Sequence, residues 1–244
     1  MKLRTDMHVH SEKSYDSKQT LCEIAAACKA SGTNAVCITD HNIFYRGERI
    51  IDGIYFYPGI EISTDKGHLL GLFCDSPVEP VPDFDEAVRR IHEAGGLAVL
   101  AHPYQSRRKT KSEVDTLIKD SADKLDGIEI QNSRACIHVS GANEFARKAA
   151  LDCSLFPTGG SDGHLSCEIG SSYAVIECEN TDTESVREAV KLGRISVKGK
   201  NSKRIFTAKS QYIKLKKKKS GIKKHAKLWI FAVWCVFADI FKKR

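Results

Sequence analysis

The sequence lacks a Cys-x-x-Cys motif, although it contains nine cysteines. Their number is odd, and most of them lie in apolar stretches such as residues 26–28 and 36–38. A disulfide scaffold or a cysteine-based metal site normally shows paired cysteines at regular spacing. This pattern excludes both classes and predicts buried, reduced thiols.

The N-terminus lacks the apolar run of a signal peptide, because residues 1–6 read MKLRTD. Such a run is the usual mark of a secreted protein. We therefore expect a reducing, cytoplasmic location.

Acidic residues are scarce at the C-terminal end. The 244-residue chain has a formal net charge of +7. From Lys209 onward, 12 lysines or arginines face a single acid, Asp239, which leaves residues 1–208 with a net charge of −4. A basic face over a whole domain indicates a nucleic-acid or membrane partner, but here the excess is confined to one segment. We therefore divide the chain into a body, residues 1–208, and a tail, residues 209–244.

The tail also lacks a hydrophobic run long enough to cross a bilayer. Its apolar stretch, residues 228–241, is about 21 Å long as a helix, against a hydrocarbon core of about 30 Å. Two interpretations stay open: an anchor at an anionic membrane surface, or a helix that docks on the body or on another subunit. Lysine-rich tails also bind nucleic acid. The predicted location is cytoplasmic, with a peripheral membrane contact as one alternative.

The body alternates short apolar runs with segments of helical period, which is typical of an α/β fold around a largely parallel sheet. The predicted strands are residues 34–39, 53–62, 68–73, 97–101, 127–131 and 172–177. Helical spacing links Leu21 to Cys28, Phe84 to Ile91, and Phe145 to Leu151. We expect a barrel-like or layered α/β domain.

Histidines and carboxylates follow the predicted strands. Carboxyl ends of strands converge at one edge of an α/β sheet or barrel, so side chains that follow different strands meet there. The residues in such positions are His8, His10, Asp40, His41, His102, Asp162 and His164.

His8 and His10 alone are a weak signal, because nine histidines in this chain give about 0.3 His-x-His pairs by chance. Six of the nine histidines, however, lie in motifs that combine imidazole with carboxylate. The motifs are His8-Val9-His10 with Asp16, Thr39-Asp40-His41-Asn42, Gly59-Ile60-Glu61, Gly67-His68, Ala101-His102-Pro103 and Ser161-Asp162-Gly163-His164. Such a donor set suits Zn²⁺, Mn²⁺ or Fe²⁺, and several carboxylates suit more than one ion.

The ordered set resembles the polymerase and histidinol phosphatase (PHP) domain family over roughly residues 3–200. The resemblance implies a distorted seven-stranded β/α barrel, (β/α)7, that holds two or three divalent metal ions (Mn, Fe or Zn). It implies that one ion is held by His8, His10 and Glu61 with Asp162 as a bridge, a second by Asp16, His41 and His164, and a third by Glu61, His68 and His102. Asp16 departs from the family pattern, because it lies six residues after His10 where many members have five.

Such a cluster supports hydrolysis of a phosphate monoester of a small metabolite or nucleotide by a water molecule that the ions activate. Asp6 and Asp40 are candidates for orienting ligand imidazoles or accepting a proton, with turn capping as the alternative for Asp40. Arg134, on a loop after a strand, is a candidate for substrate contact, whereas residues 107–109 are expected to form a solvated loop.

Three other functions stay open. The first is a nuclease-like phosphodiesterase to which the tail delivers RNA or DNA. The second is a non-catalytic metal-binding module, against which the complete set of nine ligand positions argues. The third is an amide hydrolase, since related barrels also use His-x-His metal sites.

Overall fold

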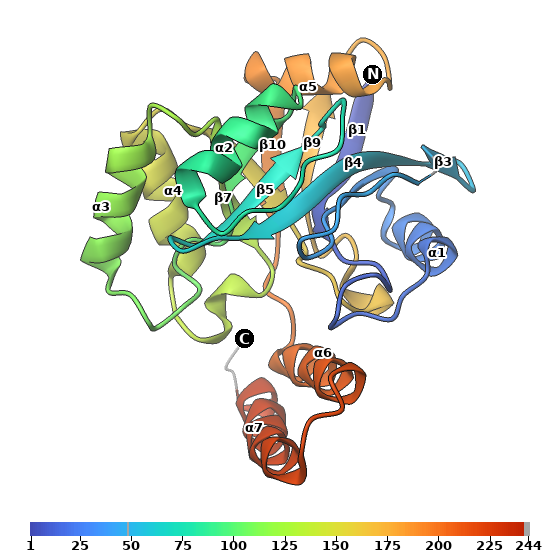
Figure 1. Cartoon of the computed structure of the whole chain (residues 1–244). Coiled ribbons are helices and arrows are strands. Elements are labelled where there is room, and N and C mark those ends of the chain that lie inside the picture. Colours follow the sequence, from blue (N-terminus) through green and yellow to red (C-terminus); the bar gives the residue numbers. More distant parts are fainter. Residues whose placement is uncertain (48, 242–244) are drawn as a thin grey trace.

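The computed structural model describes residues 1–47 and 49–241, so the last three residues of the predicted tail lie outside the described part. One sheet runs in the order β10-β9-β1-β2-β4-β5-β6-β7-β8, with β3 paired to β4 (Figure 1). The strands are β1 (Lys2–Val9), β2 (Ala35–Ile38), β3 (Ile50–Ile51), β4 (Ile54–Ser63), β5 (His68–Leu72), β6 (Leu97–Leu100), β7 (Gly127–Asn132), β8 (Phe156–Gly160), β9 (Ser172–Glu177) and β10 (Ile195–Gly199). The six predicted strands are all present, at boundaries within one or two residues.

The sheet is mixed rather than largely parallel. Strands β1, β2 and β4 pair in parallel, as do β6, β7 and β8, but β5 runs antiparallel to both of its neighbours. Only residues 64–67 connect β4 to β5, and a parallel crossover needs a dozen or more residues. The short connection therefore reverses the chain, which apolar periodicity alone does not reveal.

The two ends of the sheet approach each other, so the barrel is nearly closed. A Cβ atom added to Gly159 in β8 would lie 2.4 Å from a methyl group of Val197 in β10. An isolated bridge also joins Val9, at the end of β1, to Gly163 beyond β8. The predicted distorted α/β barrel is confirmed, although it is built from more than seven strands.

Most helices of the body begin at a side-chain cap. Thr20 and Thr110 each form a capping box with a glutamate three residues later, and Asp83 and Asp182 cap through one backbone N–H. The α-helices are α1 (Leu21–Ser31), α2 (Phe84–Glu93), α3 (Lys111–Ser121), α4 (Ala142–Asp152) and α5 (Thr183–Lys191), and the short 3₁₀ helices are η1 (Ala135–Ile137) and η2 (Ser166–Glu168). The predicted helical segments fall in α1, α2 and α4 and are confirmed.

Helices α2, α3 and α4 pack their apolar sides against the second half of the sheet. Phe84 and Ile91 of α2 are fully buried with Leu69 and Ile128 of the strands. Each such side chain contributes roughly 1.5–3 kcal/mol on burial. Five of the nine cysteines are buried, while Cys22 and Cys167 are exposed, so the prediction of buried thiols holds for most of them only.

The chain ends in a helical hairpin at one end of the barrel, formed by α6 (Arg204–Lys217) and α7 (Ile222–Ile240) (Figure 1). The predicted division between residues 208 and 209 falls inside α6. Asp239, near the end of α7, accepts hydrogen bonds from the backbone N–H groups of Arg204 and Ile205 at 3.0 and 3.1 Å and so caps α6. Among the described residues, no helix is long and apolar enough to cross a membrane.

Candidate metal centre

The predicted ligands gather at one edge of the barrel, as their positions after strands indicated. His10 directly follows β1, His41 follows β2, and His102 follows β6. His68 is the first residue of β5, and because β5 is antiparallel to β4 it lies opposite Ser63, at the end of β4. A mixed sheet thus brings the start of one strand to the same edge as the ends of its neighbours.

Glu61, in β4, lies at the centre of this cluster and is 1% exposed. Its Oε1 is 2.6 Å from Nδ1 of His68 and 3.1 Å from Nε2 of His102. The distances from its Oε2 are 2.7 Å to His41 Nδ1, 3.5 Å to His10 Nε2 and 3.6 Å to His8 Nε2. Burial opposes ionisation of Glu61, but the surrounding imidazoles outweigh it and hold its pKa well below the ordinary value.

Asp16 and Asp162 complete the cluster. The Asp16 carboxylate lies 3.4 Å from Nε2 of His41 and 3.2 Å from Nε2 of His164. Asp162 Oδ1 lies 3.3 Å from His10 Nε2, 3.4 Å from His164 Nδ1 and 3.8 Å from His8 Nε2. The structure therefore brings together each of the three predicted ligand sets, including the one with the displaced Asp16. Their binding of metal stays a prediction.

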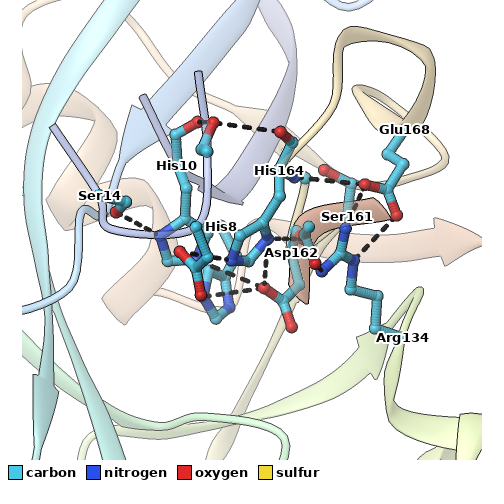
Figure 2. Close-up of polar contacts among 12 residues, drawn as sticks. His8, His10, Ser14, Arg134, Ser161, Asp162, His164 and Glu168 are labelled. Carbon is cyan, nitrogen blue, oxygen red and sulfur yellow. Dashed lines mark hydrogen bonds and ion pairs between the residues drawn. The ribbon is translucent and has the colours of Figure 1, made fainter. Parts of the chain in front are cut away.

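Three histidines are fixed through Nδ1 so that Nε2 faces the cluster. Nδ1 of His8 lies 3.0 Å from Glu129 Oε1, and Nδ1 of His164 lies 2.8 Å from the backbone oxygen of Asp162. Nδ1 of His10 lies 3.1 Å from Ser14 Oγ (Figure 2). A carboxylate or carbonyl oxygen only accepts, so the proton is on Nδ1 and the lone pair of Nε2 is free for a metal.

Asp40 acts on His10 through Ser14. The Ser14 hydroxyl donates its only proton to Asp40 Oδ1 at 2.8 Å, so its oxygen accepts from His10 Nδ1. Asp40 also accepts from the hydroxyl and backbone N–H of Ser11, at 2.6 and 2.7 Å. Its carboxylate therefore holds the loop after β1 and orients the His10 imidazole through Ser14. The hydrogen bonds from Ser11 fit the capping alternative as well, so the roles predicted for Asp40 stay predictions.

Asp6 lies behind the cluster. Its carboxylate accepts hydrogen bonds from the backbone N–H groups of Ser161 and Gly170, both at 2.8 Å. Burial raises its pKa to about 6, although these hydrogen bonds oppose the shift. Asp6 thus fixes the loop that carries Asp162, and its predicted roles of orienting an imidazole or accepting a proton stay predictions.

Arg134 is buried, each of its three guanidinium nitrogens donates a hydrogen bond, and Figure 2 shows its pair with Glu168. Nε and Nη2 donate to the two carboxylate oxygens of Glu168, the former at 2.9 Å, and Nη1 donates to Ser210 Oγ at 3.0 Å. Ser210 belongs to α6, so this group ties the hairpin to the barrel. The predicted contact of Arg134 with substrate stays a prediction, and its partners here give it no support.

The histidines of the cluster differ in basicity. Burial and the neighbouring imidazoles of His164 and His41 lower the pKa of His10 to about 3. For His41, burial also lowers the pKa, but the carboxylates of Glu61 and Asp16 outweigh it and raise the pKa to about 10. A proton on His41 thus competes with a metal, so we expect metal affinity to fall as the pH is lowered.

The donor set fits divalent metal ions. Nε2 of His8 and Nε2 of His10 are buried and have no hydrogen-bond partner among the described residues. Buried polar atoms in native proteins are normally paired, with protein, water or an ion. The donors of His8, His10 and Glu61 lie within 4.8 Å of one another, as do those of His41, Glu61 and His68. Imidazole nitrogens and carboxylate oxygens at this separation can bind a zinc, manganese or iron ion.

Glu129 is a further residue of the candidate site, and no motif of the sequence indicates it. It lies in β7 and is 1% exposed, and its second oxygen accepts from the backbone N–H of His102 at 2.9 Å and from Nδ2 of Asn132 at 3.0 Å. It therefore positions two of the predicted ligands, His8 and His102. The available signal was an acid between Ile128 and Ile130 in a strand that is otherwise apolar.

The backbone around the ligands is tightly constrained. His102 and Asp162 adopt left-handed φ angles of 27° and 53°. Such angles in residues other than glycine cost free energy and are often found at functional sites. A Cβ atom on Gly160 would lie 2.4 Å from Cβ of His8, so only glycine lets β8 come this close to β1.

A cavity of about 480 Å³ adjoins the cluster beside His68 and His102. Its other lining residues include the cationic side chains of Lys66, Arg108 and Lys109. Lys66 forms an ion pair with Asp85 at 2.6 Å, whereas the Arg108 side chain has no ion-pair partner among the described residues. Residues 107–109 form an exposed loop, as expected, and two of them, Arg108 and Lys109, also line the cavity.

Comparisons with solved structures agree with this fold. The chain resembles a two-domain protein from Bacteroides vulgatus that contains a predicted PHP-like metal-dependent phosphoesterase, with a TM-score of 0.62, 20% identity, and coverage of 87% of this chain and 70% of that one. It also resembles the lesion-specific endonuclease PfuEndoQ from Pyrococcus furiosus, with a TM-score of 0.58, 19% identity, and coverage of 81% of this chain and 58% of that one.

The sequence itself also has relatives. Two uncharacterised proteins from Methanocaldococcus jannaschii are 28% identical over 221 residues and 30% identical over 146 residues. The alignments cover 87% and 54% of this chain, and 86% and 82% of the respective relatives. Residues 6–95 match the PHP domain and residues 140–195 match the PHP-associated domain. Together with the ligand cluster and the barrel, these matches show that the chain belongs to the PHP domain family.

Proposed function

We propose that this protein is a metal-dependent phosphoesterase that hydrolyses a phosphate monoester of a small metabolite or nucleotide. The observation that carries the proposal is the convergence of six histidines on three buried carboxylates. Nε2 of His8 and Nε2 of His10 are buried there without a hydrogen-bond partner among the described residues. Two or three divalent ions bound there would neutralise phosphoryl oxygens and lower the pKa of a bound water towards about 7.

The protein's own residues prepare the site for such ions. Glu129 and Ser14 keep the Nε2 lone pairs of His8 and His10 directed at the cluster. Glu61, placed between the imidazoles, supplies a charge that more than one ion can share. Rigid placement of this kind limits the reorganisation needed during the reaction.

The cavity beside His68 and His102 supports a substrate of limited size. Its volume of about 480 Å³ lies within the roughly 300–1,000 Å³ typical of small-molecule sites. Arg108 and Lys109 in its wall supply positive charge for a phosphate group.

The first test is an assay of purified protein after metal removal and reloading. We expect hydrolysis of an aryl phosphate with Mn²⁺, Fe²⁺ or Zn²⁺, complete loss of activity with a chelator, and recovery on adding metal back. Metal analysis should find two or three ions per chain. The substrate panel should include mononucleotides, phosphorylated metabolites, an aryl phosphodiester, an aryl amide and a single-stranded oligonucleotide.

The panel also separates the other functions. Cleavage of the oligonucleotide or the phosphodiester without monoester hydrolysis would favour a nuclease-like enzyme, and cleavage of the amide alone would favour an amide hydrolase. A fully metal-loaded protein that cleaves nothing in the panel would indicate a binding module. Activity that survives chelation would contradict the metal-dependent mechanism altogether.

For the hairpin, we propose peripheral binding to an anionic membrane surface. The outer face of α7 carries large apolar side chains that are at least half exposed: Trp229, Ile230, Val233, Phe237 and Ile240. Lysines of the same segment, such as Lys223 and Lys227, supply the charge that attracts anionic head groups. A second hairpin packed on this face would bring the same lysines and would not neutralise them, and an apolar face of this extent is unusual on a free surface.

Vesicle sedimentation tests this proposal. The protein should bind vesicles that contain phosphatidylserine and not neutral phosphatidylcholine vesicles, and the double variant Trp229→Ser/Phe237→Ser should lose most of the binding. The matched control is Leu151→Ser/Leu192→Ser, which removes two exposed apolar side chains outside the hairpin. Equal binding by both double variants, or a dimer that Trp229→Ser/Phe237→Ser dissociates, would overturn the membrane proposal.

A further inference from the structure

Helix α6 reaches the loop that carries a predicted metal ligand. Nζ of Lys217 donates to the backbone oxygens of Glu12 and Ser14, both at 2.7 Å. Asp16 follows two residues later, and Ser14 also orients His10. The last turn of α6 is therefore fixed against the rim of the metal cluster.

Tyr15 connects this turn of α6 to the cluster. Its ring is stacked on the imidazole of His41, with centroids 4.6 Å apart and an interplanar angle of 6°. Nζ of Lys214 and Nζ of Lys218 lie 4.5 and 4.7 Å from the centroid of the same ring. Two ammonium groups are thus only one aromatic ring away from a histidine of the cluster.

These two lysines form no ion pair with any of the described residues. Other lysines lie within 3.0 Å of an Asp or Glu oxygen, namely Lys2, Lys66, Lys111, Lys124 and Lys191. Lys214 is half-buried, and burial together with the nearby Lys218 lowers its pKa, although the Asp16 carboxylate opposes the shift. Cation–π contact with Tyr15 offsets only part of the repulsion between two such charges. An anion bound between them would remove it.

We propose that Lys214, Lys218 and Tyr15 form a subsite for a second, non-reacting phosphate group of the substrate. The inference rests on the proposed phosphoesterase function and extends it, because it gives α6 a direct part in substrate selection. The other edge of the site, near His68 and His102, adjoins the cavity. A substrate would then extend from the cavity across the ions to α6. Its second phosphate group belongs either to a bisphosphorylated small molecule or to the next phosphodiester of a short nucleic acid.

The test compares substrates with one and with two phosphate groups, using the full chain loaded with metal. The probes are an aryl monophosphate, a nucleoside bisphosphate and a 5′-phosphorylated dinucleotide. The preference is the ratio of kcat/KM for a two-phosphate probe to kcat/KM for the monophosphate. In the double variant Lys214→Gln/Lys218→Gln, we expect this ratio to fall by about 10- to 100-fold, because KM for the two-phosphate probe rises. The preference of the wild-type protein should weaken as salt is raised.

The control is Lys216→Gln/Lys219→Gln, which removes two charges from exposed positions of the same segment and should keep the preference. The two-phosphate probe for which Lys214→Gln/Lys218→Gln loses the wild-type preference identifies the source of the second phosphate. Wild-type protein that hydrolyses the aryl monophosphate but shows no preference for either two-phosphate probe overturns the subsite and leaves the proposed function intact. An equal loss of kcat/KM on all probes in both double variants also overturns the subsite, since the lysines would then act only through the net positive charge of the segment. Inactivity of the wild-type protein on every probe contradicts the proposed function instead.

Discussion

Replacing Glu61 by glutamine is expected to lower kcat/KM by at least about 1,000-fold. The substitution removes the carboxylate that the first and the third predicted ions would share. Its two oxygens lie within 3.6 Å of imidazole nitrogens of His8, His10, His41, His68 and His102. Glutamine keeps the shape but not the charge, so the protein should also retain fewer metal ions. Activity and metal content measured on the same preparation, with its thermal unfolding, check this result.

Two matched variants make the result specific. Glu129→Gln changes a carboxylate that contacts predicted ligands, His8 and His102, rather than a predicted ion, so we expect metal affinity to fall by about 10- to 100-fold. Glu93→Gln changes an exposed partner of Arg89 and should have no effect on activity. If Glu61→Gln keeps its full metal content and more than a tenth of the wild-type activity, Glu61 is not the shared ligand.

Arg134→Met is expected to lower the free energy of unfolding by about 3–5 kcal/mol, because it leaves the buried carboxylate of Glu168 without its cation. Both side chains of this pair are at most 5% exposed. Glu168 also accepts from the hydroxyl of Ser202 at 2.8 Å, so the disturbance would extend to the start of the hairpin. Urea unfolding of the variant measures the loss.

The same variant decides between the two roles of Arg134. Arg89→Met, which breaks an exposed ion pair on α2, is the control and should cost less than about 1 kcal/mol. Adding Glu168→Gln to Arg134→Met should recover part of the loss, since it removes the unpaired charge. A variant with unchanged stability and a KM raised more than tenfold would instead support the predicted contact with substrate.

That the predicted ligands gather at one place could be foreseen from the sequence, because each lies in a short motif of fixed composition. His41 follows β2, and Asp162 and His164 follow β8, as the apolar runs before them predicted. Strand ends meet at one edge whatever the order of the strands, so the motifs meet there as well. Even Asp16, one residue out of the family spacing, reaches His41 and His164.

The residues around the ligands were harder to find. Glu129 and Ser14 act through single hydrogen bonds to Nδ1 atoms, and no local pattern indicates which tautomer a histidine adopts. Arg134 was placed correctly on a loop beside the site, but its partners Glu168 and Ser210 lie 34 and 76 residues further on. Contacts between such distant positions depend on the tertiary fold, which composition does not specify.

The hairpin was also only partly predicted. The lysine-rich stretch suggested a segment distinct from the body, yet α6 already begins at Arg204 and α7 at Ile222. Lysine is a good helix former, so a run of lysines does not interrupt a helix as glycine or proline would. The change in charge along the chain therefore did not coincide with a structural boundary.

The cap that Asp239 places on α6 has a practical consequence for anyone who shortens this chain. Removing α7 would leave the first backbone N–H groups of α6 without the Asp239 carboxylate as acceptor. Cutting after residue 208 would leave Arg134 without Ser210, and the loop after β1 without Lys217. Neither cut yields an intact barrel that merely lacks an appendage. Point substitutions on the outer surface of α7, rather than truncations, are the way to separate what the hairpin binds from what it holds in place.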